Sequence, residues 1–120
     1  MDPRSDHPSR RDTGRAAEDL AARFLERKGH VVLARNLRVG RGEIDILAEI
    51  DGERAVVEVR SRWAASDAGS PDPLDAFDAA KARQVRKLAA SLPARARRVD
   101  LIAVRFHRHG VDLLWLPRAG

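Results

Sequence analysis

The sequence predicts a single α/β domain in which helices flank a mixed β-sheet, with the element order α-β-β-β-α-β-β. Three observations support this fold class: an amphipathic helical stripe over residues 15–28, alternating strand runs on both sides of Asp51–Gly52, and a second helical pattern before two apolar runs. A strand, a helix and a further strand indicate a parallel pair with a right-handed crossover, so the fourth strand is expected to lie parallel to the third.

Composition limits the kinds of protein that fit. A chain of 120 residues, 43% hydrophobic and 34% charged, indicates one folded domain with one modest core. Cysteine is absent, which excludes disulfides and thiolate metal sites. No apolar run approaches the ~20 residues of a membrane span, and the N-terminus lacks the apolar core of a signal peptide, so we expect a cytoplasmic location and no membrane partner. The net charge of +5 favours polyanions such as nucleic acid and is weak support for one.

The first helix is predicted after a disordered tail at residues 1–12, and the folded domain is expected to span residues 13–120. Asp12 or Thr13 would cap a helix over residues 15–28, and Gly29 would end it. Glu18 lies at the edge of the buried stripe, where it would either face the sheet or remain an exposed residue favoured by the helix dipole. The stripe comprises Ala17, Leu20, Ala21, Phe24 and Leu25.

A short strand is predicted at residues 30–35, followed by a turn or a bulged edge at residues 36–41. Arg38 and Arg41 in this segment are candidate phosphate contacts.

The two runs at residues 42–50 and 53–60 predict a hairpin, because Asp-Gly between alternating apolar runs is a strong hairpin signal. With Asp51 and Gly52 as the loop, paired residues have numbers that sum to 103, so Asp45 is opposite Glu58. Alternation then predicts one polar face and one apolar face. The polar face would hold Glu43, Asp45, Glu58 and Arg60, and the apolar face Ile44, Ile46, Val57 and Val59.

Like charges directly opposed on a sheet, with Cβ atoms about 5 Å apart, are destabilising, so the pairing of Asp45 with Glu58 needs a cause. A hard divalent cation such as Mg²⁺ is one, since one or two carboxylates commonly hold it. A hairpin face whose charges are screened by water and by Arg60 is the other. The pattern alone leaves both interpretations open.

A polar segment at residues 64–73 predicts a mobile loop, and a second helix follows at residues 75–92, ended by Pro93. Trp63, just before the loop, would either stack on a base or pack against the rim of the sheet. Lys81 and Gln84 fall inside the apolar stripe of the helix and would reach the carboxylate face; a salt bridge from Lys81 to an aspartate is the alternative.

The last two strands are predicted at residues 98–106 and 111–116, joined by a turn at residues 107–110. His107 and His109 in this turn are a weak metal signal, because a third ligand is missing from the pattern.

The segments GEIDIL at residues 42–47 and VEVRSR at residues 57–62 resemble the YraN-like uncharacterised bacterial family, whose signature is GEIDLI followed by FVEVKxR. The resemblance covers about residues 14–106. That family is similar to the PD-(D/E)XK nuclease superfamily and, in fold, to archaeal Holliday-junction resolvases. The resemblance therefore implies a restriction-endonuclease-like αβββαβ core with an extra C-terminal strand. One departure stands out, because Arg60 replaces the motif lysine.

The resemblance also implies a set of site residues. Asp45 and Glu58 would hold Mg²⁺ or Mn²⁺ together with the Val59 carbonyl, and Glu18 would complete or orient this shell. Arg60 occupies the place of the motif lysine, with Lys81 as a possible substitute. Asp100 matches a family aspartate and is interpreted as a structural partner of an arginine. Candidate nucleic-acid contacts are Arg35, Asn36, Arg38, Arg41, Arg62 and Gln84.

The function expected from this resemblance is Mg²⁺-dependent hydrolysis of branched or single-stranded DNA, or less readily of RNA, in repair or recombination. The alternative is a nucleic-acid-binding module with weak or no turnover, because Arg60 is not lysine. A third interpretation is an interaction protein whose acidic cluster is structural. Resolvase-like relatives are dimers, which makes a homodimer a further expectation.

Overall fold

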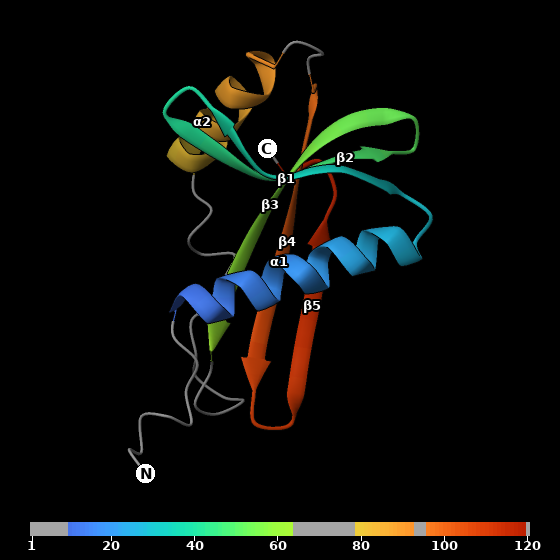
Figure 1. Ribbon diagram of the computed structural model, residues 1–120, viewed down its shortest axis with the longest axis vertical. Helices are drawn as coiled ribbons and strands as arrows, with labels where there is room; N and C mark the ends of the chain where they lie inside the picture. Colours follow the sequence, from blue (N-terminus) through green and yellow to red (C-terminus); the bar gives the residue numbers. More distant parts are fainter. Residues whose placement is uncertain (1–9, 64–78, 93–95, 120) are drawn as a thin grey trace.

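The computed structural model describes residues 10–63, 79–92 and 96–119, and these residues form two helices and five strands (Figure 1). The predicted loop at residues 64–73, the start of the second helix at residues 75–78 and most of the predicted tail lie outside the described residues. The elements are α1 (Arg10–Arg27), β1 (Val31–Val39), β2 (Gly42–Ile50), β3 (Glu53–Trp63), α2 (Ala79–Ala90), β4 (Arg98–His107) and β5 (Gly110–Leu116).

The five strands form one mixed sheet in the order β1-β2-β3-β4-β5. The pairs β1–β2, β2–β3 and β4–β5 are antiparallel, and β3 and β4 are parallel, with α2 in the connection between them. The predicted α/β fold, its element order and its single parallel pair are confirmed. This arrangement is compatible with an endonuclease-like αβββαβ core followed by one additional strand.

Helix α1 begins at Arg10, five residues before the predicted start, so Thr13 lies inside the helix instead of capping it. Pro8 is the last proline before the helix, and nothing between Arg10 and Thr13 interrupts helical geometry. The apolar stripe of α1 packs on one face of the sheet, as predicted. Its fully buried members are Ala17, Ala21, Ala22 and Leu25. None of the described helices is long and apolar enough to cross a lipid bilayer.

The predicted hairpin and its register are confirmed. Ile46 pairs with Val57 and Ile50 with Glu53, so the numbers of paired residues sum to 103. Asp51 and Gly52 adopt φ angles of 52° and 79°. Positive φ at both loop residues is the requirement of the two-residue turn that matches strand twist, which explains the Asp-Gly sequence.

The predicted division of the hairpin into one apolar and one polar face is wrong at Ile44. Ile44 packs with Val56 against α2, whereas Ile46 and Val57 pack against α1 on the opposite face. Strict alternation would place Ile44 and Ile46 on the same face. The alternation breaks at Asp45, which lies beyond the end of the β2–β3 ladder at Ile46.

Strand β1, which pairs with β2, is also irregular. Its register with β2 shifts between Val32 and Ala34, and Asn36 adopts a left-handed φ of 51°. The register shift lies before residues 36–41, which were predicted as a turn or a bulged edge. The strand continues to Val39 instead of ending at Arg35, and the turn is confined to Gly40 and Arg41. Asn36 is suited to the position because asparagine tolerates left-handed geometry better than most residues.

Gly42, the first residue of the GEIDIL segment, lies against α2. A Cβ atom at this position would lie 2.8 Å from both methyl carbons of Leu88. The absence of a side chain therefore lets the start of β2 approach α2 closely, which helps to position the acidic residues that follow it.

A buried ionic network ties β4 to the C-terminal segment. Asp100 is fully buried, and its two carboxylate oxygens accept hydrogen bonds from Arg98 Nε and Nη2 at 2.8 and 3.0 Å. The Trp115 indole Nε1 and the Arg118 backbone N–H donate to the same carboxylate at 2.9 and 3.1 Å. The interpretation of Asp100 as a structural partner of an arginine is confirmed.

Candidate functional site

The candidate site lies where β2 and β3 separate. The ladder between these strands ends at the pair Ile46–Val57. Beyond it, the backbone N–H of Val59 donates a 2.9 Å hydrogen bond to Asp45 Oδ2. The aspartate side chain thus replaces a backbone acceptor, which fixes its carboxylate at the gap between the two strands.

Glu58 meets Asp45 at this gap. Its neighbours Val57 and Val59 pack towards α1, so alternation directs the Glu58 side chain to the other face of the sheet. Glu58 is only 3% exposed there. Burial, and then hydrogen bonding to and repulsion from Asp45, raise the pKa of Glu58 to about 8, while Lys81 and Arg60 act in the opposite direction. The two carboxyl groups therefore converge at this gap.

A group of polar residues, Asn36, Glu18 and Glu43, lies beside Asp45. With its amide nitrogen oriented toward the acceptors around it, Asn36 donates to Glu18 at 2.9 and 3.2 Å and to Glu43 Oε1 at 3.2 Å. The pKa of Glu18 is raised by burial and by Asp45, against the lowering effect of Asn36 and Arg35. Glu43 was not predicted from the sequence to belong to the site. Its position two residues before Asp45 on the same strand could have indicated this.

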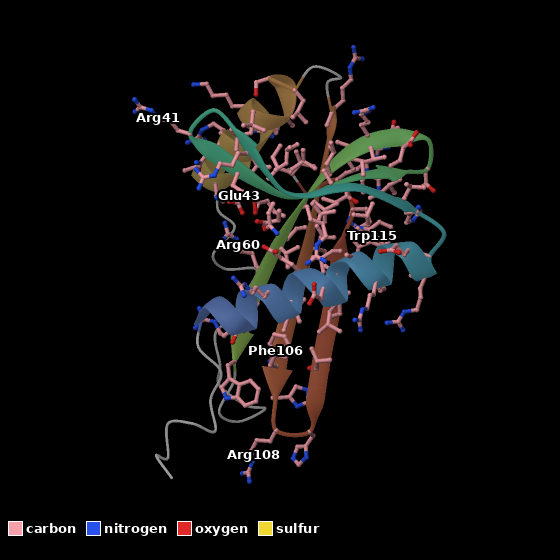
Figure 2. The ribbon with its side chains drawn as sticks, in the orientation of Figure 1. Arg41, Glu43, Arg60, Phe106, Arg108 and Trp115 are labelled. Carbon is pink, nitrogen blue, oxygen red and sulfur yellow. The ribbon has the colours of Figure 1, made fainter. Side chains whose placement is uncertain are left out.

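Three cationic residues border the carboxylates. Arg35 forms a 2.6 Å ion pair with Asp19 of α1, close enough to lower the pKa of Glu18. Lys81 of α2 is half-buried, and its charge acts on Glu58, as the helical stripe predicted. Figure 2 shows Arg60 and Glu43 on the same side of the molecule, between the β1–β2 hairpin and α1.

Other predicted site residues lie elsewhere. Gln84 is exposed instead of buried, and it lines a groove against the β1–β2 turn with Arg41 and Lys87, because the buried stripe of α2 runs through Val85 and Ala89. Arg38 and Arg62 are exposed on β1 and β3. Trp63 stacks on Phe106 with ring centroids 6.4 Å apart, which confirms the interpretation that it packs on the sheet.

The acidic pair suits a hard divalent ion by the chemistry of its donors. Carboxylate oxygens are the ligands that Mg²⁺ and Mn²⁺ prefer. Burial, and then the proximity of Asp45, raise the pKa of Glu58, so a cation at this place would favour its charged form. In the part of the chain that the structure describes, no three acidic or histidine side chains are grouped to hold an ion. The candidate centre is therefore the pair Asp45 and Glu58, with Glu18 hydrogen-bonded to Asn36 and close enough to Asp45 for their charges to interact.

The raised pKa of Glu58 predicts how stability depends on pH when no divalent ion is present. Between pH 4.5 and about 8 the folded protein keeps a proton that the unfolded chain has lost. Stability should therefore fall as pH rises through this window, by at most ~1.4 kcal/mol per pH unit for one group. Glu58→Gln removes the titrating group, so its unfolding free energy in urea with EDTA should exceed that of the wild type at pH 8 and approach it at pH 5. Parallel pH profiles for the two proteins would contradict the burial of Glu58 beside Asp45.

The fold and the site define the class as a small mixed α/β protein with a carboxylate pair, one member buried and one half-buried, bordered by basic residues. Comparison with known proteins identifies its family. The chain belongs to the uncharacterised protein family UPF0102, whose model matches residues 17–104. The resemblance to the YraN-like family that the two sequence segments indicated is thereby confirmed.

Relatives from several bacteria show the same membership. The chain is 44% identical over 107 residues to a UPF0102 protein of Solibacter usitatus, covering 88% of this chain and 78% of that protein. It is 44% identical over 98 residues to one of Paenarthrobacter aurescens, covering 76% and 78%. It is 47% identical over 75 residues to one of Thermotoga neapolitana, covering 62% of this chain and 65% of that relative, which is less than two thirds of the relative's length.

Proposed function

We propose that this protein is a Mg²⁺-dependent phosphodiesterase that hydrolyses DNA, branched or single-stranded, in repair or recombination in the cytoplasm. Mn²⁺ is the alternative ion, and RNA the less favoured substrate. The observation that carries the proposal is the convergence of Asp45 and Glu58 where β2 and β3 separate. A buried acid beside a second, half-buried one is costly without a cation, and a stable fold that keeps such a pair indicates a function for it.

In this proposal Asp45 and Glu58 hold the ion with the Val59 carbonyl. A divalent ion bound there supplies charge for the phosphate oxygens and lowers the pKa of a water molecule. The chain itself positions the pair: the Val59 N–H fixes Asp45, and the packing of Val57 and Val59 fixes Glu58. Glu18 acts from outside the pair, through Asn36, which bridges it to Glu43.

Arg60 and Lys81 supply positive charge beside the pair. Both lower the pKa of Glu58, so both lie within electrostatic range of the acids. In the motif this chain resembles, a lysine stands at the position of Arg60. Arginine keeps the charge, but it does not lose a proton and its planar fork has a different shape. Lys81 on α2 would supply the titratable amine that the motif lysine provides at the position of Arg60.

Arg35, Arg38, Arg41 and Arg62 are the proposed phosphate contacts outside the reacting group. Arg38, Arg41 and Arg62 are exposed, and the net charge of +5 would draw a polyanion to the surface that carries them.

The second candidate function is a nucleic-acid-binding module with weak or no turnover. The specific observation that favours it is the replacement of the motif lysine by Arg60. Metal and DNA would then bind at the same residues without efficient hydrolysis.

Arg60→Lys distinguishes the two candidates. If the protein is a nuclease limited by its arginine, the lysine variant should cleave about tenfold faster, because it restores a compact amine of adjustable pKa. The measurement is the initial rate of cleavage of labelled branched, single-stranded and duplex DNA with Mg²⁺ or Mn²⁺. If both proteins bind DNA and neither cleaves with any ion, the binding module is correct and the nuclease is rejected. If neither binds at low salt, both candidates fail.

A further inference from the structure

Two arginines at one end of the sheet bury a guanidinium nitrogen without a partner. Nε of Arg60 on β3 and Nε of Arg105 on β4 have no hydrogen-bond partner in the described part of the chain. Native proteins leave few buried polar atoms unpaired, and each one indicates strain or an absent water, ion or ligand. Because guanidinium groups are permanently charged donors, their strongest partner is an oxyanion. The Nε atoms are buried, so an oxyanion from outside would meet the outer Nη nitrogens of these half-buried side chains.

Strand pairing brings these two arginines to the same face of the sheet. Arg60 is next to Ala103, and Arg62 is next to Arg105, across the parallel β3–β4 pair. Residues two apart on a strand share a face, so Arg60, Arg62 and Arg105 lie on the same face as Glu58. The opposite face, which carries Ile102 and Val104, packs against α1.

Among the described residues, helix α2 packs on this face at its other end. The apolar cluster under α2 contains Val56 and Val99, which precede the arginines on β3 and β4. Figure 1 shows the far ends of β3, β4 and β5 extending away from α2 toward the β4–β5 turn. Arg62 is exposed, and Arg60 and Arg105 are half-buried. The row of arginines therefore starts beside the Asp45–Glu58 pair and extends beyond the part of this face on which α2 packs.

Asp112 of β5 is an acidic residue beside this group of arginines. It lies opposite Arg105, with Oδ2 at 3.6 Å from the Arg105 guanidinium and 3.4 Å from His107 Nε2. A separation of 3.6 Å is too long for a good hydrogen bond, and the Asp112 side chain is 64% exposed. Such an exposed pair is weak, so Asp112 competes only mildly for Arg105.

We propose that Arg60, Arg62 and Arg105 form a phosphate track for one DNA strand, which runs from the Asp45–Glu58 pair along β3 toward the β4–β5 turn. Successive arginines on β3 are ~6.6 Å apart, and the neighbouring strand is ~4.8 Å away, so the track is narrow and fits one backbone. The inference deepens the proposed function and rests on it only in taking DNA as the polyanion. Arg105 is the new residue that it adds.

The test is fluorescence anisotropy of a labelled single-stranded oligonucleotide in EDTA and low salt, where no metal-dependent cleavage occurs. Arg105→Gln should weaken binding about fivefold and reduce the slope of log K against log salt by about one. Asp112→Asn should tighten binding about twofold, because it removes the competing carboxylate. Arg23→Gln, which removes the same charge from an exposed position on α1, is the matched control and should change binding less than twofold.

The opposite signs of the two variants guard against misfolding, since a damaged protein would not bind more tightly. If Arg105→Gln weakens binding no more than Arg23→Gln, or if Asp112→Asn does not tighten it, the track is rejected and the proposed metal site is unaffected. If the variants behave as expected while the wild type never cleaves, the track stands and the protein is the binding module. If the wild type does not bind the oligonucleotide at all, the track and the DNA function fall together.

Discussion

Asp45→Asn is expected to reduce metal-dependent DNA cleavage at least ~100-fold while leaving the fold intact. The asparagine side chain still offers an oxygen to the Val59 N–H, so the 2.9 Å hydrogen bond that positions residue 45 is preserved. What it lacks is the negative charge that, together with Glu58, would attract the ion. The measurement is the single-turnover cleavage rate with saturating Mg²⁺ or Mn²⁺, beside the melting temperature of both proteins.

Glu49→Gln is the matched control for that change. It removes one acidic charge from the same strand at an exposed position, and it should leave the cleavage rate within about twofold of the wild type, as distant surface charges do. Equal rates for wild type and Asp45→Asn, with normal cleavage by both, would exclude Asp45 from the chemistry. An equal loss of cleavage rate in Asp45→Asn and Glu49→Gln would indicate a general effect of charge instead of the loss of a metal ligand.

Asp100→Asn is expected to lower the free energy of unfolding by about 3 kcal/mol, near the low end of the effect of breaking a buried ion pair. The change leaves the Arg98 charge buried without its closest partner, and it weakens the hydrogen bonds from Trp115 and Arg118. The low end applies because Asp51 and Glu53, each with a carboxylate oxygen 3.8 Å from Arg98 Nη1, still offset part of the charge. Urea unfolding at neutral pH measures the effect.

Asp112→Asn serves as the control for stability. It removes an aspartate from the neighbouring strand that is exposed and only loosely paired, so it should change the unfolding free energy by less than about 0.5 kcal/mol. If the two variants unfold at the same urea concentration, Asp100 is not the centre of the network that joins β4 to the C-terminal segment.

Most of the fold was predictable because its signals are local. The Asp-Gly turn, the apolar stripe of α1 and the apolar run of β4 each depend on residues close in sequence, and all were confirmed. The start of α1 was not predictable from a capping pattern, because the residues after Pro8 tolerate helix as well as coil. The register followed from the turn alone.

The irregular backbone at the site was harder to predict. Perfect alternation placed Ile44 and Ile46 together, whereas the break at Asp45 and the left-handed Asn36 beside it place them on opposite faces. Such breaks are tertiary features, because they arise where two strands separate and a side chain replaces a ladder hydrogen bond. The convergence of Asp45 with Glu58 was nevertheless expected, and the contacts between these residues agree with it.

Lys81 and Gln84 illustrate the limits of helical periodicity. Both fell inside the same predicted stripe, but the helix is rotated so that Val85 and Ala89 face the sheet, which leaves Lys81 near Glu58 and turns Gln84 toward the β1–β2 turn. A rotation of this size depends on how neighbouring residues pack, such as Gly42 against Leu88, and single-sequence patterns do not contain it.

A titration with Mn²⁺, followed by the electron paramagnetic resonance signal of the free ion, tests the central claim most directly. Wild-type protein is expected to remove one Mn²⁺ per chain from solution at pH 8, and both Asp45→Asn and Glu58→Gln to remove none in the same range. If the wild type leaves the signal of the free ion unchanged, or if the two variants bind as well as the wild type, Asp45 and Glu58 do not share a metal ion.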